Sequence, residues 1–243
     1  MEKANLPEGT VSLAAISDKI PSVIGELINN FHISVVTPAP IRNIKGSERF
    51  HADMSLCHLG MNSFIIEPGN IAVASELIKL GAKSEISDDV TAVFPGLNVC
   101  LIDNIMVCNE KTADVKILTY CRNNNKRIIQ TNQMYTKCST AIITKDAVIT
   151  SDESIYKVCI KEKLDVIKVD NRGIRLEGYN YGFIGGCCGL ISKDTLAFSG
   201  RIEDHPDYYK IKDFTLNHGV YTVSLGNTEL YDIGGILPIL ERI

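Results

Sequence analysis

One strand-and-turn pattern recurs along this chain and restricts the folds that it can adopt. Residues 97–110 (LNVCLIDNIMVCNE), 139–152 (STAIITKDAVITSD) and 188–201 (CGLISKDTLAFSGR) each consist of an apolar strand, a polar turn, a second apolar strand and a polar exit. A helix-like stretch follows each copy, so the repeating unit is about 40 residues long. A repeat of this length indicates a ring or an open array of units rather than one wound sheet.

Helical stretches alternate with the strands, which predicts an α/β fold. We expect five helices, each followed by a strand, over residues 17–31, 71–80, 113–124, 153–163 and 207–218. Asn70 is placed to cap the second helix and Gly81 to end it. The units then cover about 15–69, 70–110, 111–150, 151–204 and 205–243, within a single domain spanning 1–243.

Five units can close into a ring or remain an open array. A ring leaves no sheet edge exposed, and the last unit shows no polar capping face of the kind that ends an open array. The predicted fold is therefore a five-bladed α/β propeller of pseudo-repeats.

Composition and charge exclude several classes of function. The net charge is −4, acids and bases are interspersed and Trp is absent, which disfavours a nucleic-acid partner. The first ten residues do not read as a signal peptide and no apolar run has membrane-spanning length, so we expect a cytoplasmic protein without a membrane partner. The eight cysteines lack zinc-site spacing, so we expect reduced thiols and no metal.

The corners between strands carry most of the reactive side chains, and in a ring they would converge on the axis. The candidates are His51, Asp53, Cys57 and His58 in the first unit, Asp88 and Asp89 in the second, Cys138 in the third, Cys187 and Cys188 in the fourth, and Glu229 and Asp232 in the fifth. A thiol, an imidazole and carboxylates that face one cavity can support nucleophilic thiol chemistry on a cationic small molecule.

Five α/β units in a ring resemble the pentein, or guanidine-modifying, superfamily, which includes arginine deiminases, amidinotransferases and dimethylarginine dimethylaminohydrolases. Residues 51–62 (HADMSLCHLGMN) are similar to the His-x-Asp segment of that family, and residues 136–146 (TKCSTAIITKD) resemble its nucleophile strand. The resemblance implies that His51 is the general acid/base, that Asp53 contacts the guanidinium group and that Cys138, two units later, is the nucleophile.

Residues 230–239 (LYDIGGILPI) resemble the Gly-Gly-containing second repeat of the family, which would make the chain circularly permuted. Glu229 and Asp232 are then further substrate-binding candidates, together with Asp53. The chain departs from the family where Gly185 and Gly186 replace expected carboxylates and where Ile236 replaces an expected Asp.

The sequence leaves the nucleophile open between two cysteines. Cys187 is the rival of Cys138, because GGCCGLIS also resembles a nucleophile strand. A buried, inert thiol is the competing interpretation for Cys138, and a hydrogen-bonded structural role is the competing interpretation for His51.

The leading functional hypothesis is a cysteine-dependent hydrolase or transferase that acts on a guanidino- or amidino-type small molecule. It would proceed through a covalent thiouronium intermediate and need no cofactor. The alternative is a non-catalytic binding scaffold, because the family also contains a ribosome-binding factor and fold alone does not establish function. The absent carboxylates favour the scaffold, whereas the His51 segment and Cys138 favour the enzyme.

Overall fold

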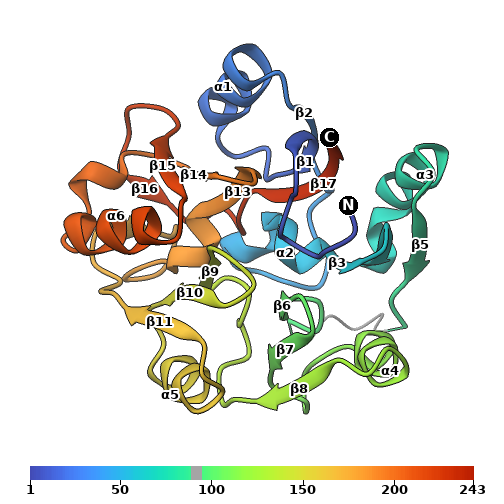
Figure 1. Cartoon of the computed structure of the whole chain (residues 1–243). Helices are drawn as coiled ribbons and strands as arrows, with labels where there is room; N and C mark the ends of the chain where they lie inside the picture. Colours follow the sequence, from blue (N-terminus) through green and yellow to red (C-terminus); the bar gives the residue numbers. More distant parts are fainter. Residues whose placement is uncertain (89–94) are drawn as a thin grey trace.

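One local arrangement builds most of the molecule: an antiparallel strand pair, then a helix, then a strand parallel to its neighbour (Figure 1). The computed structural model describes residues 1–88 and 95–243, and the candidate acid Asp89 lies outside the described residues. Three units of this kind are separate three-stranded sheets with their helices. They are β3 (Leu56–Gly60), β4 (Ser63–Ile66), α3 (Ile71–Lys79) and β5 (Lys83–Ile86); β6 (Cys100–Ile102), β7 (Ile105–Cys108), α4 (Val115–Asn123) and β8 (Arg127–Gln130); and β9 (Thr140–Ile142), β10 (Ala147–Thr150), α5 (Glu153–Lys161) and β11 (Asp165–Lys168).

The two ends of the chain complete the same arrangement together. The late strand β17 (Leu237–Arg242) pairs antiparallel with β1 (Thr10–Ala15), and β1 pairs parallel with β2 (Ser34–Val36) after helix α1 (Pro21–Phe31). A further copy consists of β13 (Cys188–Ser192), β14 (Thr195–Phe198), α6 (Tyr208–Asn217) and β15 (Tyr221–Ser224). A bridge between Thr10 and Ser192 joins these two copies into one six-stranded sheet.

The predicted α/β class is confirmed as a mixed fold of small sheets. No single closed sheet links the strands of residues 1–88 and 95–243, and the remaining pair is β12 (Ile174–Arg175) with β16 (Leu230–Tyr231). The sheets also group the chain differently from the expected repeat boundaries, because β4 and β5 pair across the boundary at 69/70.

Helices α1, α3, α4, α5 and α6 lie at the periphery of the molecule beside the small sheets, whereas the short helix α2 (Ala52–Ser55) lies near its centre (Figure 1). Their apolar stripes explain the packing: Ile117 and Cys121 of α4 are buried against Leu101 and Met106 of the neighbouring strands. Burying such a side chain fully is worth roughly 1.5–3 kcal/mol. None of the helices in the described part of the chain has the length and apolar character needed to span a bilayer.

The helices begin and end close to the predicted residues, but the predicted capping interactions do not all form. Gly81 follows α3 with φ of +86°, a conformation that suits glycine, as predicted. Asn70 precedes that helix but its side chain does not cap it, so the predicted cap is wrong. Its amide instead bonds the backbone of Ala39 in both directions, at 2.6 Å and 3.2 Å. Asp114 and Asp152 cap the next two helices through their carboxylates.

Candidate active site

His51 lies where the 3₁₀ turn η1 (Ser47–Phe50) passes into the short helix α2 (Ala52–Ser55). The side chain is buried, and its backbone N–H donates to the carbonyl of Glu48 at 3.0 Å. Gly234 packs directly against it, because a Cβ at this position would lie 2.3 Å from the His51 Cβ. With its φ of +75°, this glycine lets the segment before β17 turn close to the imidazole.

Cys138 lies just before β9, on a turn that one buried amide holds in place. The backbone N–H groups of Lys137 and Cys138 both donate to Oδ1 of Asn98, at 3.0 Å and 3.1 Å. The Nδ2 of Asn98 approaches the Cys138 Sγ at 3.3 Å. Asn98 therefore fixes the backbone beside the thiol and also offers the sulfur a hydrogen bond.

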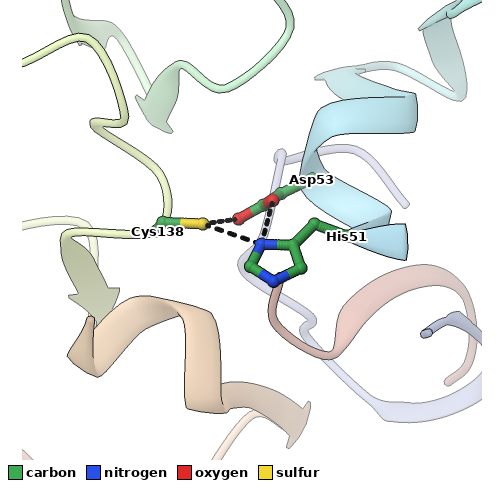
Figure 2. Close-up of side chains that lie close together, drawn as sticks. All are labelled: His51, Asp53 and Cys138. Carbon is green, nitrogen blue, oxygen red and sulfur yellow. Dashed lines mark hydrogen bonds and ion pairs between the residues drawn. The ribbon is translucent and has the colours of Figure 1, made fainter. Parts of the chain in front are cut away.

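The structure brings His51, Asp53 and Cys138 together from two distant parts of the chain (Figure 2). The thiol of Cys138 donates to Oδ2 of Asp53 at 2.8 Å, and its Sγ lies 3.7 Å from Nδ1 of His51. The same Nδ1 lies 4.0 Å from Oδ1 of Asp53. All three side chains are buried. A thiol, an imidazole and a carboxylate are thus within contact distance of one another.

Asp232 adds a second buried carboxylate to this cluster. Its Oδ1 lies 3.7 Å from Nδ1 of His51, and the backbone N–H groups of Phe183 and Gly234 donate to its two oxygens. A Cβ at Gly186 would lie only 2.0 Å from Oδ1 of Asp232. Gly186 therefore leaves room for a carboxylate that arrives from another segment.

The electrostatics of the cluster favour the protonated, neutral forms of Asp53, Asp232 and the Cys138 thiol. Burial raises the pKa of Asp53 from 3.8 to about 6, although His51 opposes the rise. Burial also raises the pKa of Asp232. Burial first, and then the neighbouring carboxylates Asp53 and Asp232, raise the pKa of the Cys138 thiol well above its usual range. A cation placed beside these carboxylates would oppose all three shifts, because it stabilises nearby negative charge.

A cavity of about 300 Å³ opens onto this cluster. It is bordered by Glu48, His51, Tyr135, Cys138, Leu176, Tyr179, Asn180, Tyr181, Phe183 and Asp232. Asp53 does not border it and instead borders a much smaller cavity of about 10 Å³. Cys138 and Asp232 are therefore the parts of the cluster that a bound molecule meets, together with His51.

The other predicted site residues lie elsewhere. The Cys187 thiol is fully buried and donates to the carbonyl of Ile184 at 3.2 Å, within the largest hydrophobic cluster. Glu229 is exposed and pairs with Arg175 at 3.6 Å. Neither Cys187 nor Glu229 is among the described residues that border the cavity.

The sequence did not identify Asn98 or the additional residues that border the larger cavity beside Cys138. Asn98 sits in an ordinary turn before a strand, and no motif marks it. The segment 176–183 (LEGYNYGF) does carry a signal, because three aromatic residues alternate with turn-forming residues in a stretch without a strand pattern.

The three central side chains could also hold a metal ion. Ligand atoms of His51, Asp53 and Cys138 lie within 4.8 Å of one another. Nitrogen, oxygen and thiolate donors of this kind suit zinc, and a site with three protein ligands leaves one position open. Metal binding and nucleophilic attack would compete for the same sulfur.

Comparison with solved structures places the fold among guanidine-modifying enzymes. The inosamine-phosphate amidinotransferase of Streptomyces griseus is 10% identical, covering 100% of this chain and 97% of its own, with a TM-score of 0.59. A DDAH from Pseudomonas aeruginosa, complexed with citrulline, is 8% identical over 89% of this chain and 92% of its own (TM-score 0.57). The agmatine deiminase of C. jejuni is 12% identical over 91% of this chain and 89% of its own (TM-score 0.53).

These similarities confirm the predicted resemblance to the pentein superfamily in fold. No curated protein matches the chain. A family model matches residues 15–237, and the chain therefore belongs to the family of unknown function DUF6873.

Proposed function

We propose that this chain is a cysteine-dependent enzyme that acts on a guanidino or amidino group of a small molecule through a covalent intermediate at Cys138. One observation carries the proposal: the Cys138 Sγ lies 2.8 Å from Asp53 and 3.7 Å from the His51 Nδ1, beside a cavity that Asp232 also borders. We propose with it that the chain is a single domain in which five strand–strand–helix–strand units surround a common axis, and the repeated order of strands and helices supports this arrangement.

The reaction starts from a protonated thiol. A bound guanidinium cation next to Asp232 lowers the thiol pKa, and the proton passes from Cys138 to His51. The thiolate attacks the planar carbon and forms a C–S bond, which gives a tetrahedral intermediate. His51 returns the proton to the departing nitrogen and the C–N bond breaks. The amine leaves the site, and an S-linked thiouronium remains on Cys138.

His51 is then free to act as a base in the second half of the reaction. It takes a proton from water, or from an acceptor amine in a transferase, and the oxygen or nitrogen attacks the same carbon. The C–S bond breaks and the sulfur regains a proton. Hydrolysis and transfer differ only in which nucleophile enters the cavity, so the site supports both and the choice between them depends on the acceptor.

The two buried carboxylates have different places in this scheme. Asp232 borders the cavity and can accept hydrogen bonds from the guanidinium N–H groups, each worth about 1.5–3 kcal/mol when a charged group takes part. Asp53 does not border this cavity, and it accepts a hydrogen bond from the protonated thiol in the resting state. Asp53 thus holds Cys138 inactive until a cation binds.

Site-resolved labelling by mass spectrometry tests the proposal. Chloroacetamidine mimics the guanidinium group, and neutral iodoacetamide serves as the reference, each from about pH 5 to pH 9. We expect the amidine to label Cys138 selectively, and the selectivity to disappear in His51→Asn. The control is His32→Asn, at an exposed histidine whose left-handed backbone Asn tolerates. Selective labelling of Cys187 would refute the assignment of the nucleophile.

Ligand binding without chemistry is the competing function, and one observation favours it. The pKa of the Cys138 thiol is raised, whereas an activated nucleophile has a lowered one. Slow labelling of every thiol, with no preference for the amidine, would establish the binding role and reject the enzyme.

A further inference from the structure

The ionisable groups that line the cavity are mainly acidic. Its ionisable lining consists of the carboxylates Glu48 and Asp232, the imidazole of His51, the thiol of Cys138 and tyrosine hydroxyls. No Lys or Arg is among the described residues that border it. A substrate carboxylate would therefore find no Lys or Arg partner among these residues, and an ionised carboxylate of the lining would repel it.

Glu48 is not part of the reactive cluster, yet its carboxylate has spare hydrogen-bonding capacity. Its Oε1 accepts a hydrogen bond from the hydroxyl of Tyr179. Its Oε2 is buried and has no hydrogen-bond donor among the described residues. A buried carboxylate oxygen without a hydrogen-bond donor destabilises the folded protein. A cationic N–H group of a ligand that donated to this atom would remove that cost.

Aromatic side chains form most of the remaining wall. Tyr135, Tyr179, Tyr181 and Phe183 all border the cavity, and the rings of Tyr181 and Phe183 meet edge to face with centroids 6.3 Å apart. The faces of such rings attract ammonium and guanidinium groups. Together with Glu48 they offer a second cation site, separate from the carboxylate beside Cys138.

The two sides of this second site are tied to each other. The hydroxyl of Ser47 donates to the backbone carbonyl of Glu177 at 2.8 Å, and the Glu48–Tyr179 hydrogen bond lies next to it. The segment 176–183 is thereby held against η1. Glu48 and the aromatic residues then act on the same end of a bound molecule.

We propose that the substrate is an alkylguanidine that carries a second cation and no carboxylate, with its distal ammonium group held by Glu48 and the surrounding aromatic rings. The proposal rests on the proposed function for the guanidinium end, which Asp232 and Cys138 receive. A cavity of about 300 Å³ suits a molecule of this small size.

Calorimetric titration of Cys138→Ser, in which chemistry is blocked, tests the distal site with three probes. Agmatine carries guanidinium and ammonium groups, butylguanidine lacks the ammonium, and arginine adds a carboxylate. We expect agmatine to bind about tenfold more tightly than butylguanidine, and arginine to bind more weakly than agmatine.

Substitution of Glu48 in the same background identifies the residue responsible. In Glu48→Gln, agmatine affinity should fall about tenfold, to the level of butylguanidine, while butylguanidine affinity stays the same. Glu76→Gln is the matched control, because it removes the same charge from an exposed position on α3 and should change neither affinity.

The outcomes separate this inference from the proposed function. Equal binding of agmatine and butylguanidine, tighter binding of arginine, or no binding of any probe would overturn the distal cation site. Preferential agmatine binding that depends on Glu48, with no amidine labelling of Cys138 in the wild-type protein, would keep the site and reject the chemistry.

Discussion

Two corners of the molecule carry a buried cysteine immediately before or at the start of a strand, and they pack against each other. The Cys138 corner (residues 136–139) precedes β9, and the Cys187 corner (residues 184–188) leads into β13. A Cβ at Gly185 in the second corner would lie 2.3 Å from the carbonyl oxygen of Thr140. Burial raises the thiol pKa of both cysteines well above its usual range. Local structure and burial therefore do not distinguish the two thiols.

The difference lies in what other segments bring to each sulfur. Cys138 has hydrogen bonds with Asp53 and Asn98 and lies beside His51, whereas the Cys187 thiol donates to the backbone carbonyl of Ile184, three residues away in its own turn. Tertiary partners therefore distinguish the proposed nucleophile from a thiol of the core, although both belong to similar strand sequences.

Exchange of each sulfur for oxygen gives the strongest test of this difference. Cys138→Ser should reduce amidine labelling and any turnover at least ~1000-fold, because the nucleophile is lost. Cys187→Ser should leave labelling of Cys138 nearly unchanged but lower the free energy of unfolding by about 1–3 kcal/mol, because a hydroxyl replaces a thiol in the core. Labelling kinetics and urea unfolding measure the two effects, and a reversal of the pattern would exchange the roles of the corners.

The carboxylate beside Cys138 should give this corner a pH-dependent stability that the other lacks. Burial raises the pKa of Asp53 from 3.8 to about 6. Between these values the folded protein binds more protons than the unfolded chain, so the Asp53 contribution to stability falls as pH rises. Asp53→Asn removes that loss, and the variant should gain roughly 3 kcal/mol relative to wild type between about pH 4 and pH 7.

Urea unfolding at a series of pH values measures this gain. Asp213→Asn, at an exposed position on α6, is the control and should run parallel to wild type. A difference between Asp53→Asn and wild type that does not change with pH would show that Asp53 is not buried as an unfavourable charge.

Substitution of Gly186, which lies in the Cys187 corner, should affect ligand binding beside Cys138 more than the structure of its own corner. In Gly186→Ala the new methyl group collides with the carboxylate of Asp232, 2.0 Å away, and pushes it from the cavity. We expect agmatine affinity to fall about 30-fold, the loss of roughly 2 kcal/mol from a charged hydrogen bond. Gly25→Ala in α1 is the control, because nothing lies within 4 Å of its Cβ and the helix should gain stability. Unchanged affinity in Gly186→Ala would remove Asp232 from substrate binding.

The amide beside Cys138 has the smallest expected effect. Asn98→Asp keeps an oxygen for the two backbone N–H groups but replaces the donor near the sulfur with a negative oxygen. The thiol pKa should rise by about one unit, which shifts the pH profile of iodoacetamide labelling at Cys138 towards alkaline values. The profile of an exposed reference peptide should stay in place. An unmoved profile at Cys138 would limit Asn98 to a structural role.

The sequence predicted the elements better than the site around them. Strand pairs and helices have strong periodicity, so the repeated segments and the helix that ends before Gly81 could be located. His51, Asp53 and Cys138 were accessible because a resemblance links their short motifs, and the structure places them in contact. The circular permutation stays a prediction.

Residues that act across units carry no local signal. Asn98 and Glu48 belong to unremarkable turns and reach the site only through the arrangement of the sheets. Glu229 stands three residues before Asp232, with the short strand β16 between them. Side chains alternate along a strand, and Glu229 lies exposed beside Arg175. Asn70 failed as a cap because Ala39, distant in sequence, competes for its amide.

The pairing of β1 with β17 has a consequence for the order of events in the cell. Asp232 and Gly234 can meet His51 only after the segment from residue 51 to residue 234 has left the ribosome. At about 5–20 residues per second, roughly 10–40 s separate the synthesis of these two segments. Until Asp232 has been synthesised, the Cys138 thiol lacks this second carboxylate neighbour and its burial is incomplete. The Cys138 thiol should therefore be easier to oxidise in the nascent chain than in the folded protein.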